Sequence, residues 1–163
     1  MNASDGLPRT LKITTVWLLV ATALFLGVQA WLAERTRPRV SMPEMGVVEL
    51  RRALDGHFHW PARVNGREVD FLVDTGATRT ALPGELAARL GLTEGTPVRS
   101  STAGGVAQGY EVQVDLALEG GLTARNLRVT VLPRLKAPLL GMDILGRLQF
   151  SQRDGVLRLQ PAR

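Results

Sequence analysis

The residue of this sequence best suited to chemistry is a carboxylate that follows an apolar run. Asp74-Thr75-Gly76 comes directly after residues 71–73 (Phe-Leu-Val) and is followed by Ala77. A carboxylate on a tight turn can take a proton from a water molecule, and the glycine lets backbone N–H groups approach it. An Asp after a strand is also common as a plain polar turn residue. The tripeptide therefore needs support from elsewhere in the chain.

A second segment, later in the chain, gives that support. Residues 139–145 (Leu-Leu-Gly-Met-Asp-Ile-Leu) predict a short apolar strand that runs into Gly141 and then a short apolar helix. Asp143 falls in the first turn of that helix, where the helix dipole favours a negative charge. We interpret Gly141 and Asp143 as structural support for the Asp74 loop and not as reacting groups.

Other patterns are less suited to a site. His57 and His59 share a face of a possible strand, but no third ligand accompanies them, so surface positions are favoured over a metal site. Gly104-Gly105 lacks the Lys, the Ser/Thr and the helix that follow a phosphate-binding loop. The chain has no cysteine, which excludes disulfides, a thiol nucleophile and Cys-ligated metals. We predict no metal and no other cofactor.

The distribution of charge argues against nucleic-acid binding. The net charge is +5, but residues 55–163 hold thirteen basic and eleven acidic residues and are nearly neutral. No basic cluster with interleaved aromatic side chains occurs, so no nucleic-acid partner is expected.

The N-terminal region predicts a membrane segment. Residues 13–33 carry no formal charge, and as a helix they would span about 30 Å, the thickness of a bilayer core. Trp17 and Trp31 lie near the two ends, where indole rings favour the interface. A cleaved signal peptide is the alternative, because Val28-Gln29-Ala30 has the spacing of a cleavage site. We favour an anchor because the run is longer than a usual signal core.

This segment divides the chain into a tail (1–12), an anchor (13–33), a linker (34–54) and a folded domain (55–163). Three basic residues just after the anchor and two before it slightly favour a cytoplasmic domain. A short basic tail before a first apolar segment is, however, also the pattern of an anchor that exports the domain behind it. We predict a single-pass protein of the inner (cytoplasmic) membrane with its domain in the periplasm.

Short strands with close turn signals predict an all-β, barrel-like domain with one or two short helices. The clearest hairpin joins residues 58–64 to 67–73 through Asn65-Gly66. A helix is expected over 83–90, ended by Gly91. A helical turn is expected over 49–54. Further strands are predicted at residues 97–101, 110–118, 122–132, 149–151 and 156–159.

Together these residues resemble a known family. The run 71–77, the glycine-rich segment 102–109 and the segment 139–145 are similar, in order and spacing, to the retropepsin-like aspartic peptidases. The approach Asp55-Gly56-His57-Phe58, the Asn65-Gly66 turn and the apolar N-terminal segment resemble the bacterial membrane-anchored members. The resemblance implies a small retropepsin-like acid-protease barrel, preceded by one transmembrane helix.

The resemblance also implies an aspartic endopeptidase, a hydrolase that is active as a homodimer because each chain carries one Asp-Thr-Gly motif. Two copies of Asp74 would meet across a twofold axis and activate a water molecule. Thr75 would lock the two turns together, and Gly76 would hold the carboxylate.

By the same resemblance, residues 102–109 would form a flap over a protein or peptide substrate. Gly104 and Gly105 would let it open and close, and Ala77 would lie beside the substrate. The strand 156–159 would join a sheet shared by the two protomers. The family's usual ion pair is missing, because Thr78 and Met142 occupy its positions, so Asp143 is expected to bond Thr78 or Arg79 instead.

Three functions remain open at this point. The first is a membrane-tethered homodimeric endopeptidase. The second is a catalytically silent module on the same fold that binds an extended peptide, and the third is a dimerisation domain on an anchor. The intact Asp-Thr-Gly-Ala sequence favours the first.

Overall fold

The computed structural model describes residues 9–35, 39–42, 46–102 and 105–162. The chain divides into two compact units, residues 1–37 and residues 38–163. The first unit holds α1 (Arg9–Arg35), in which Thr10–Leu32 is long and apolar enough to cross a membrane. A signal sequence near the N-terminus would meet the same criteria. The predicted segment 13–33 therefore lies in one apolar helix.

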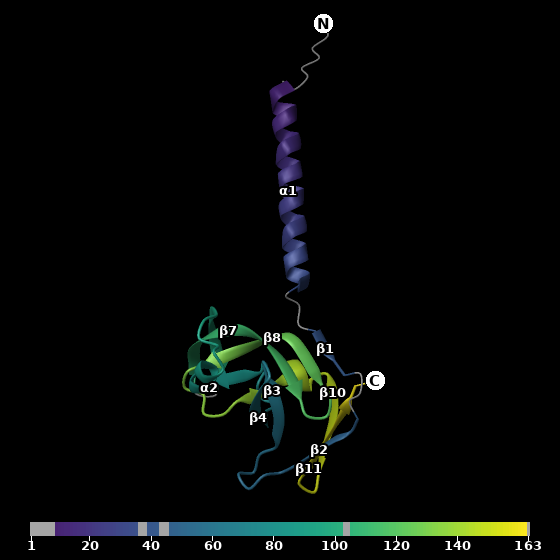
Figure 1. The fold of residues 1–163 in the computed structure, drawn as a ribbon, viewed down its shortest axis with the longest axis vertical. Helices are drawn as coiled ribbons and strands as arrows, with labels where there is room; N and C mark the ends of the chain where they lie inside the picture. The colour runs from purple at the N-terminus through teal and green to yellow at the C-terminus, as the bar shows by residue number, and fades with distance from the viewer. Residues whose placement is uncertain (1–8, 36–38, 43–45, 103–104, 163) are drawn as a thin grey trace. The chain divides into compact units, whose positions relative to one another are not determined.

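Eight strands of the second unit form one sheet that closes on itself (Figure 1). Their order is β1-β8-β5-β9-β4-β3-β7-β6, and β8 also pairs with β7, so the strands from β8 round to β7 make a barrel. Closure removes free edges from this ring. The bounds are β1 (Arg39–Ser41), β3 (His59–Val64), β4 (Arg67–Val73), β5 (Ala81–Pro83), β6 (Thr96–Thr102), β7 (Gly105–Leu118), β8 (Thr123–Leu132) and β9 (Leu139–Leu140). The predicted small all-β barrel is confirmed.

A second, three-stranded sheet consists of β10 (Leu148–Arg153), β11 (Val156–Pro161) and β2 (Val48–Arg51), in the order β10-β11-β2. Strand β11 lies in the middle, so both of its edges pair within this chain. The predicted strand 156–159 is thus the central strand of this sheet, and its place in a sheet shared by two copies stays a prediction. Among the strands that the structure describes, β10 and β2 are the edges of this sheet.

The β3–β4 hairpin shows how local sequence determines the barrel. Asn65 (φ 50°) and Gly66 (φ 81°) take the left-handed conformations of a two-residue turn. The resulting register places Trp60 opposite Phe71, and both side chains are fully buried. The indole N–H of Trp60 donates to the backbone oxygen of Glu119 at 2.8 Å, so the buried ring keeps a polar partner. The predicted hairpin is confirmed.

Two short helices complete the domain, α2 (Gly84–Arg89) and α3 (Met142–Leu145). Pro83 precedes the first turn of α2 with a φ of −59°, which is compatible with a helix start, and Gly91 follows its end with a φ of 76°. The helix expected over 83–90 is confirmed to within a residue at each end.

The predicted linker 34–54 contains two strands that belong to the sheets. Strand β1 pairs with β8, and β2 pairs with β11. The helical turn expected over 49–54 is wrong, because Val48 and Leu50 alternate with Glu49 and Arg51 in a two-residue period and pack partly against the core. Glu49 also accepts from Arg158 of β11 at 2.9 Å.

Candidate active site

The Asp74 loop begins where β4 leaves the barrel. The Asp74 N–H donates to the Leu140 oxygen at 3.1 Å, which fixes the start of the turn. Gly76 then donates its N–H to Asp74 Oδ1 at 2.8 Å. A Cβ on residue 76 would lie 3.2 Å from that oxygen, so glycine permits the close approach. Asp74 is half-buried, and Thr75 next to it is exposed.

The segment 139–145 makes hydrogen bonds to this loop. Strand β9 lies between β4 and β5, pairing in parallel with β4 and antiparallel with β5. Directly after β9, the Met142 N–H donates to the Ala77 oxygen at 2.8 Å. The Asp74 loop is therefore held at both its start and its end by the same short segment.

Asp143 fixes the chain just beyond the loop. Its carboxylate accepts from the Thr80 N–H at 3.0 and 3.1 Å, from the Thr80 hydroxyl at 2.8 Å and from the Ile144 N–H at 3.1 Å. Thr80 is fully buried, and its hydroxyl also accepts from the Gly141 N–H at 3.3 Å. The expected partners Thr78 and Arg79 were wrong, because Thr80 lies where the carboxylate can satisfy a buried hydroxyl and a buried N–H together.

Gly141 is the point of closest contact between the two segments. A Cβ there would lie 2.4 Å from the carbonyl carbon of Arg79 and 2.8 Å from the nitrogen of Thr80. Both are backbone atoms, which a side chain cannot displace without moving the loop. This residue is a glycine because the backbone of residues 79–80 occupies the place of a side chain.

Arg79 has a different role from the one expected. Its guanidinium bonds Glu111 on β7, so it ties the chain after the Asp74 loop to the barrel wall. The sequence did not predict the roles of Glu111 and Thr80. The Arg79–Glu111 and Thr80–Asp143 contacts each join residues far apart in the chain.

The segment expected to form the flap lies at the end of a hairpin of β6 and β7. The two strands pair in register from Thr96 and Glu111 to Thr102 and Gly105. Inter-strand hydrogen bonds hold most of the expected flexible segment 102–109 in strand form, despite its glycines. Gly105 has a φ of 102°, which suits glycine at the hairpin end. Gly104 lies outside the described residues.

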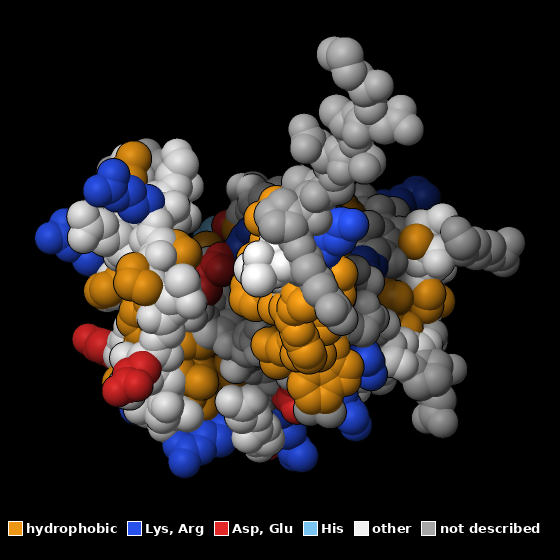
Figure 2. Space-filling view, turned by 90° about the horizontal axis from the view of Figure 1, so that it is seen from above, with side chains coloured by type: hydrophobic (Ala, Val, Ile, Leu, Met, Phe, Trp, Pro, Cys, Tyr) orange, Lys and Arg blue, Asp and Glu red, His pale blue; other side chains and the backbone are white. Residues whose placement is uncertain are grey.

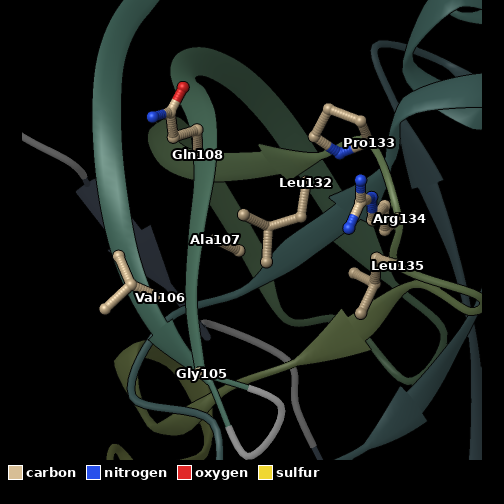
Figure 3. A pocket seen from close by; sticks show the side chains of 8 residues that line it. All are labelled: Gly105, Val106, Ala107, Gln108, Leu132, Pro133, Arg134 and Leu135. Carbon is tan, nitrogen blue, oxygen red and sulfur yellow. The ribbon is translucent and has the colours of Figure 1, made fainter.

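A cavity of about 590 Å³ lies beside this hairpin (Figure 3). One side is the start of β7, and the other is the segment that leaves β8. Its lining residues are Gly105, Val106, Ala107, Gln108, Leu132, Pro133, Arg134 and Leu135. No pattern in the sequence of residues 133–138 predicted this wall. Asp74 is not among the lining residues of this single chain.

His59 of β3 lies between two carboxylates. Its Nδ1 is 2.8 Å from Asp70 and its Nε2 is 2.9 Å from Asp55. The hydrogen bond to Asp55 is the main cause that raises the pKa of His59, against a smaller opposing effect of burial. The pKa of Asp55 is lowered, first by the N–H of His57 and then by His59. Within the described part of the chain, no group of three or more His, Cys, Asp or Glu residues is arranged to hold a metal ion.

The structure thus joins most of the predicted site residues. Gly76 and Ala77 lie with Asp74 in one loop, and Gly141 lies against the backbone that follows it. Asp143 does not bond the Asp74 loop directly but binds Thr80, which follows it. A half-buried carboxylate on a rigid loop, with an exposed threonine beside it, can activate a water molecule if a second acid is supplied.

The closed barrel, the Asp-Thr-Gly loop and the supporting Gly-Met-Asp segment define a retropepsin-like aspartic protease fold. The sequence profile of the family described as gag-polyprotein putative aspartyl protease matches residues 60–147, and the chain belongs to this family.

Three similar proteins illustrate the relationship. The crystal structure of a retropepsin-like aspartic protease from Rickettsia conorii has a TM-score of 0.59 and 30% identity, over 76% of this chain and 93% of that one. An uncharacterised protein in the cobV 5′ region of Sinorhizobium sp. is 39% identical over 69% of this chain and 51% of its own. The uncharacterised protein RP867 of Rickettsia prowazekii is 33% identical over 68% and 49%. The chain spans about half the length of these two curated relatives.

Proposed function

We propose that this chain is a membrane-anchored aspartic endopeptidase that works as a homodimer and hydrolyses peptide bonds with two Asp74 carboxylates. The observation that carries the proposal is the geometry of the Asp74 loop. The carboxylate is held by the Gly76 N–H at 2.8 Å, and the loop is fixed at its start by β9 and at its end by Met142, directly after β9. Such a fixed carboxylate costs no rearrangement when the reaction begins.

The dimer follows from the number of carboxylates. Each chain carries one Asp-Thr-Gly motif, and the mechanism needs two acids that share one proton. The ionised carboxylate takes a proton from water, and the protonated one polarises the scissile carbonyl. An isologous twofold contact supplies the second Asp74, and the exposed Thr75 is available to bond across the axis.

The substrate is an extended protein or peptide segment. The cavity between Gly105–Gln108 and Leu132–Leu135 is mostly apolar and offers space for a side chain of such a segment. The β6–β7 hairpin borders this cavity, so it is the part that would cover a bound peptide.

The apolar helix α1 supports the proposal that the enzyme is anchored. Its stretch Thr10–Leu32 would span the inner membrane once and leave the domain in the periplasm. Two anchored chains in one membrane meet at a raised local concentration, which favours the dimer.

The test uses the full chain in nonionic detergent micelles, with a mixed peptide library as substrate. Asp74→Asn keeps the shape of the side chain but removes the titrating group, and we expect it to abolish cleavage while the dimer persists. The matched control is Asp154→Asn in the exposed β10–β11 turn, where Asn tolerates the φ of 51° and activity should be unchanged.

Cleavage by wild type and Asp154→Asn, but not by Asp74→Asn, supports the peptidase. Equal cleavage by Asp74→Asn would contradict it. Peptide binding by a dimeric wild type that never cleaves would establish the silent binding module instead.

A further inference from the structure

Arg134 is the one charged side chain among the described residues that line the cavity beside the flap. The chain segments that carry the two walls, residues 96–110 and 132–140, contain Arg99, Arg134 and Lys136 but no Asp or Glu. The other side chains in these two stretches are neutral, so nothing in them compensates the cations. An acidic group placed there would be attracted, and a basic one repelled.

Arg134 is the cation that lines the cavity itself. Figure 3 places it between Pro133 and Leu135, across the cavity from Val106. Its side chain is exposed and makes no hydrogen bond or ion pair with the residues that the structure describes. A guanidinium that is unpaired beside an apolar wall is available for a carboxylate, which it can bind through two parallel N–H groups.

Four other arginines of the domain are engaged in hydrogen bonds or ion pairs. Arg79 bonds Glu111, and Arg158 bonds Glu49. Arg67 and Arg147 donate to the backbone oxygens of Arg89 and Asp143. Arg134 therefore differs from these four in having its charge free at a cavity mouth. Figure 2 shows Lys and Arg side chains scattered over the face that it draws and not gathered in one basic patch.

The strand pairing shows how a substrate would approach it. Strands β7 and β8 pair only as far as Tyr110 and Val131, and beyond this point the two chains diverge around the cavity. Among the described strands, residues 106–109 of β7 pair with β6 alone. An extended peptide can lie along the other side and place one side chain in the cavity. Side chains two residues apart on such a peptide point the same way, so a neighbour on that face comes near the cavity mouth.

We propose that Arg134 makes the enzyme selective for substrates with an acidic side chain within two residues of the apolar side chain that fills this cavity. This inference rests on the proposed peptidase function. Arg134 is a specificity-determining residue, which binds the substrate carboxylate and takes no part in proton transfer at Asp74.

The test compares matched peptides on the full chain in nonionic detergent. A cleaved neutral peptide, found in the library assay, is resynthesised with Glu, Gln or Lys at each of three positions on either side of the scissile bond. We expect wild type to prefer Glu over Gln at one position by about fivefold in kcat/KM, the size of a partly screened ion pair. The preference should weaken at high salt.

Variants assign the preference to one side chain. Arg134→Gln should abolish the Glu/Gln ratio, and Arg134→Glu should reverse it in favour of Lys. Arg128→Glu makes the same charge change on an exposed position of β8 outside the cavity lining and should leave the ratio intact. Circular dichroism checks that each variant is folded. Arg134→Gln still tests the proposal if Arg134→Glu does not fold.

Two failures are distinguishable. Cleavage of the neutral parent without any Glu preference, or an equal loss of preference in Arg128→Glu, overturns the role of Arg134 and leaves the peptidase intact. No cleavage of any peptide overturns the proposed function. In that case fluorescence anisotropy of the same Glu and Gln peptides still decides whether Arg134 selects acidic ligands, and equal affinities would overturn the selection.

Discussion

The contact between Asp143 and Thr80 should be a main source of stability at the site. Asp143→Ala removes the acceptor of the Thr80 N–H, the Thr80 hydroxyl and the Ile144 N–H. Thr80 and Ile144 are fully buried, so water cannot easily replace the lost partner. Two or three buried donors would be left unsatisfied, each at a cost of about 1–3 kcal/mol. Partial relaxation around the small alanine reduces this, and we expect a loss of about 3 kcal/mol.

The assay is urea unfolding of the full chain in nonionic detergent, followed by the fluorescence of Trp60. The chain has three tryptophans, so Trp17→Phe and Trp31→Phe leave the buried Trp60 as the only reporter. The matched control is Glu68→Ala, a carboxylate on an exposed strand position whose loss should change the free energy of unfolding by no more than about 0.5 kcal/mol.

A double-mutant cycle isolates the interaction. Thr80→Val removes the hydroxyl that donates to Asp143 and accepts from Gly141. We expect the two substitutions to be non-additive by about 1 kcal/mol, because the same hydrogen bond is lost in both. A loss below about 1 kcal/mol in Asp143→Ala, or strict additivity, would refute the argument that this carboxylate supports the loop.

The remaining predictions concern glycine packing and pH. Gly141→Ala should cost about 3 kcal/mol or more and abolish cleavage, because its Cβ would fall 2.4 Å from the backbone of Arg79. Gly46→Ala, with no atom within 4 Å of the new Cβ, should do neither, and similar unfolding midpoints for both would contradict the close contact. The folded-state pKa of His59 is raised above its ordinary 6.5, so its stabilising contribution is full below pH 6.5 and is lost as pH rises through the raised value. His59→Gln should therefore flatten the decline of thermal stability as the pH rises above about 6.5, and an unchanged decline would mean that the Asp55 contact does not form in solution.

Local patterns predicted the parts of the fold that depend on neighbouring residues. The Asn65-Gly66 turn requires two left-handed residues, and its two-residue length fixes the register that buries Trp60 and Phe71. The Asp74 loop and the Gly141 segment were predicted in order because each is a short strand followed by a turn. Their hydrogen bonds could not be assigned, since the sequence does not show that β9 lies between β4 and β5.

The features that the sequence did not predict depend on long-range pairing. Strands β1 and β2 are only three and four residues long, and their pairing partners β8 and β11 lie far along the chain. Thr80 is indistinguishable from an ordinary polar residue until its burial and the position of Asp143 are known. The cavity wall at Leu132–Leu135 is likewise made by the divergence of β7 and β8, which no local pattern indicates.

The central claim is that one site needs Asp74 from two chains. The most direct measurement is the activity of wild type and Asp74→Asn co-expressed in equal amounts, with the ratio checked by mass spectrometry. Random pairing puts two intact carboxylates in about one quarter of the dimers, so activity per total protein should fall to about a quarter of that of wild type. A fall to one half would show that each chain acts alone and would contradict the shared site.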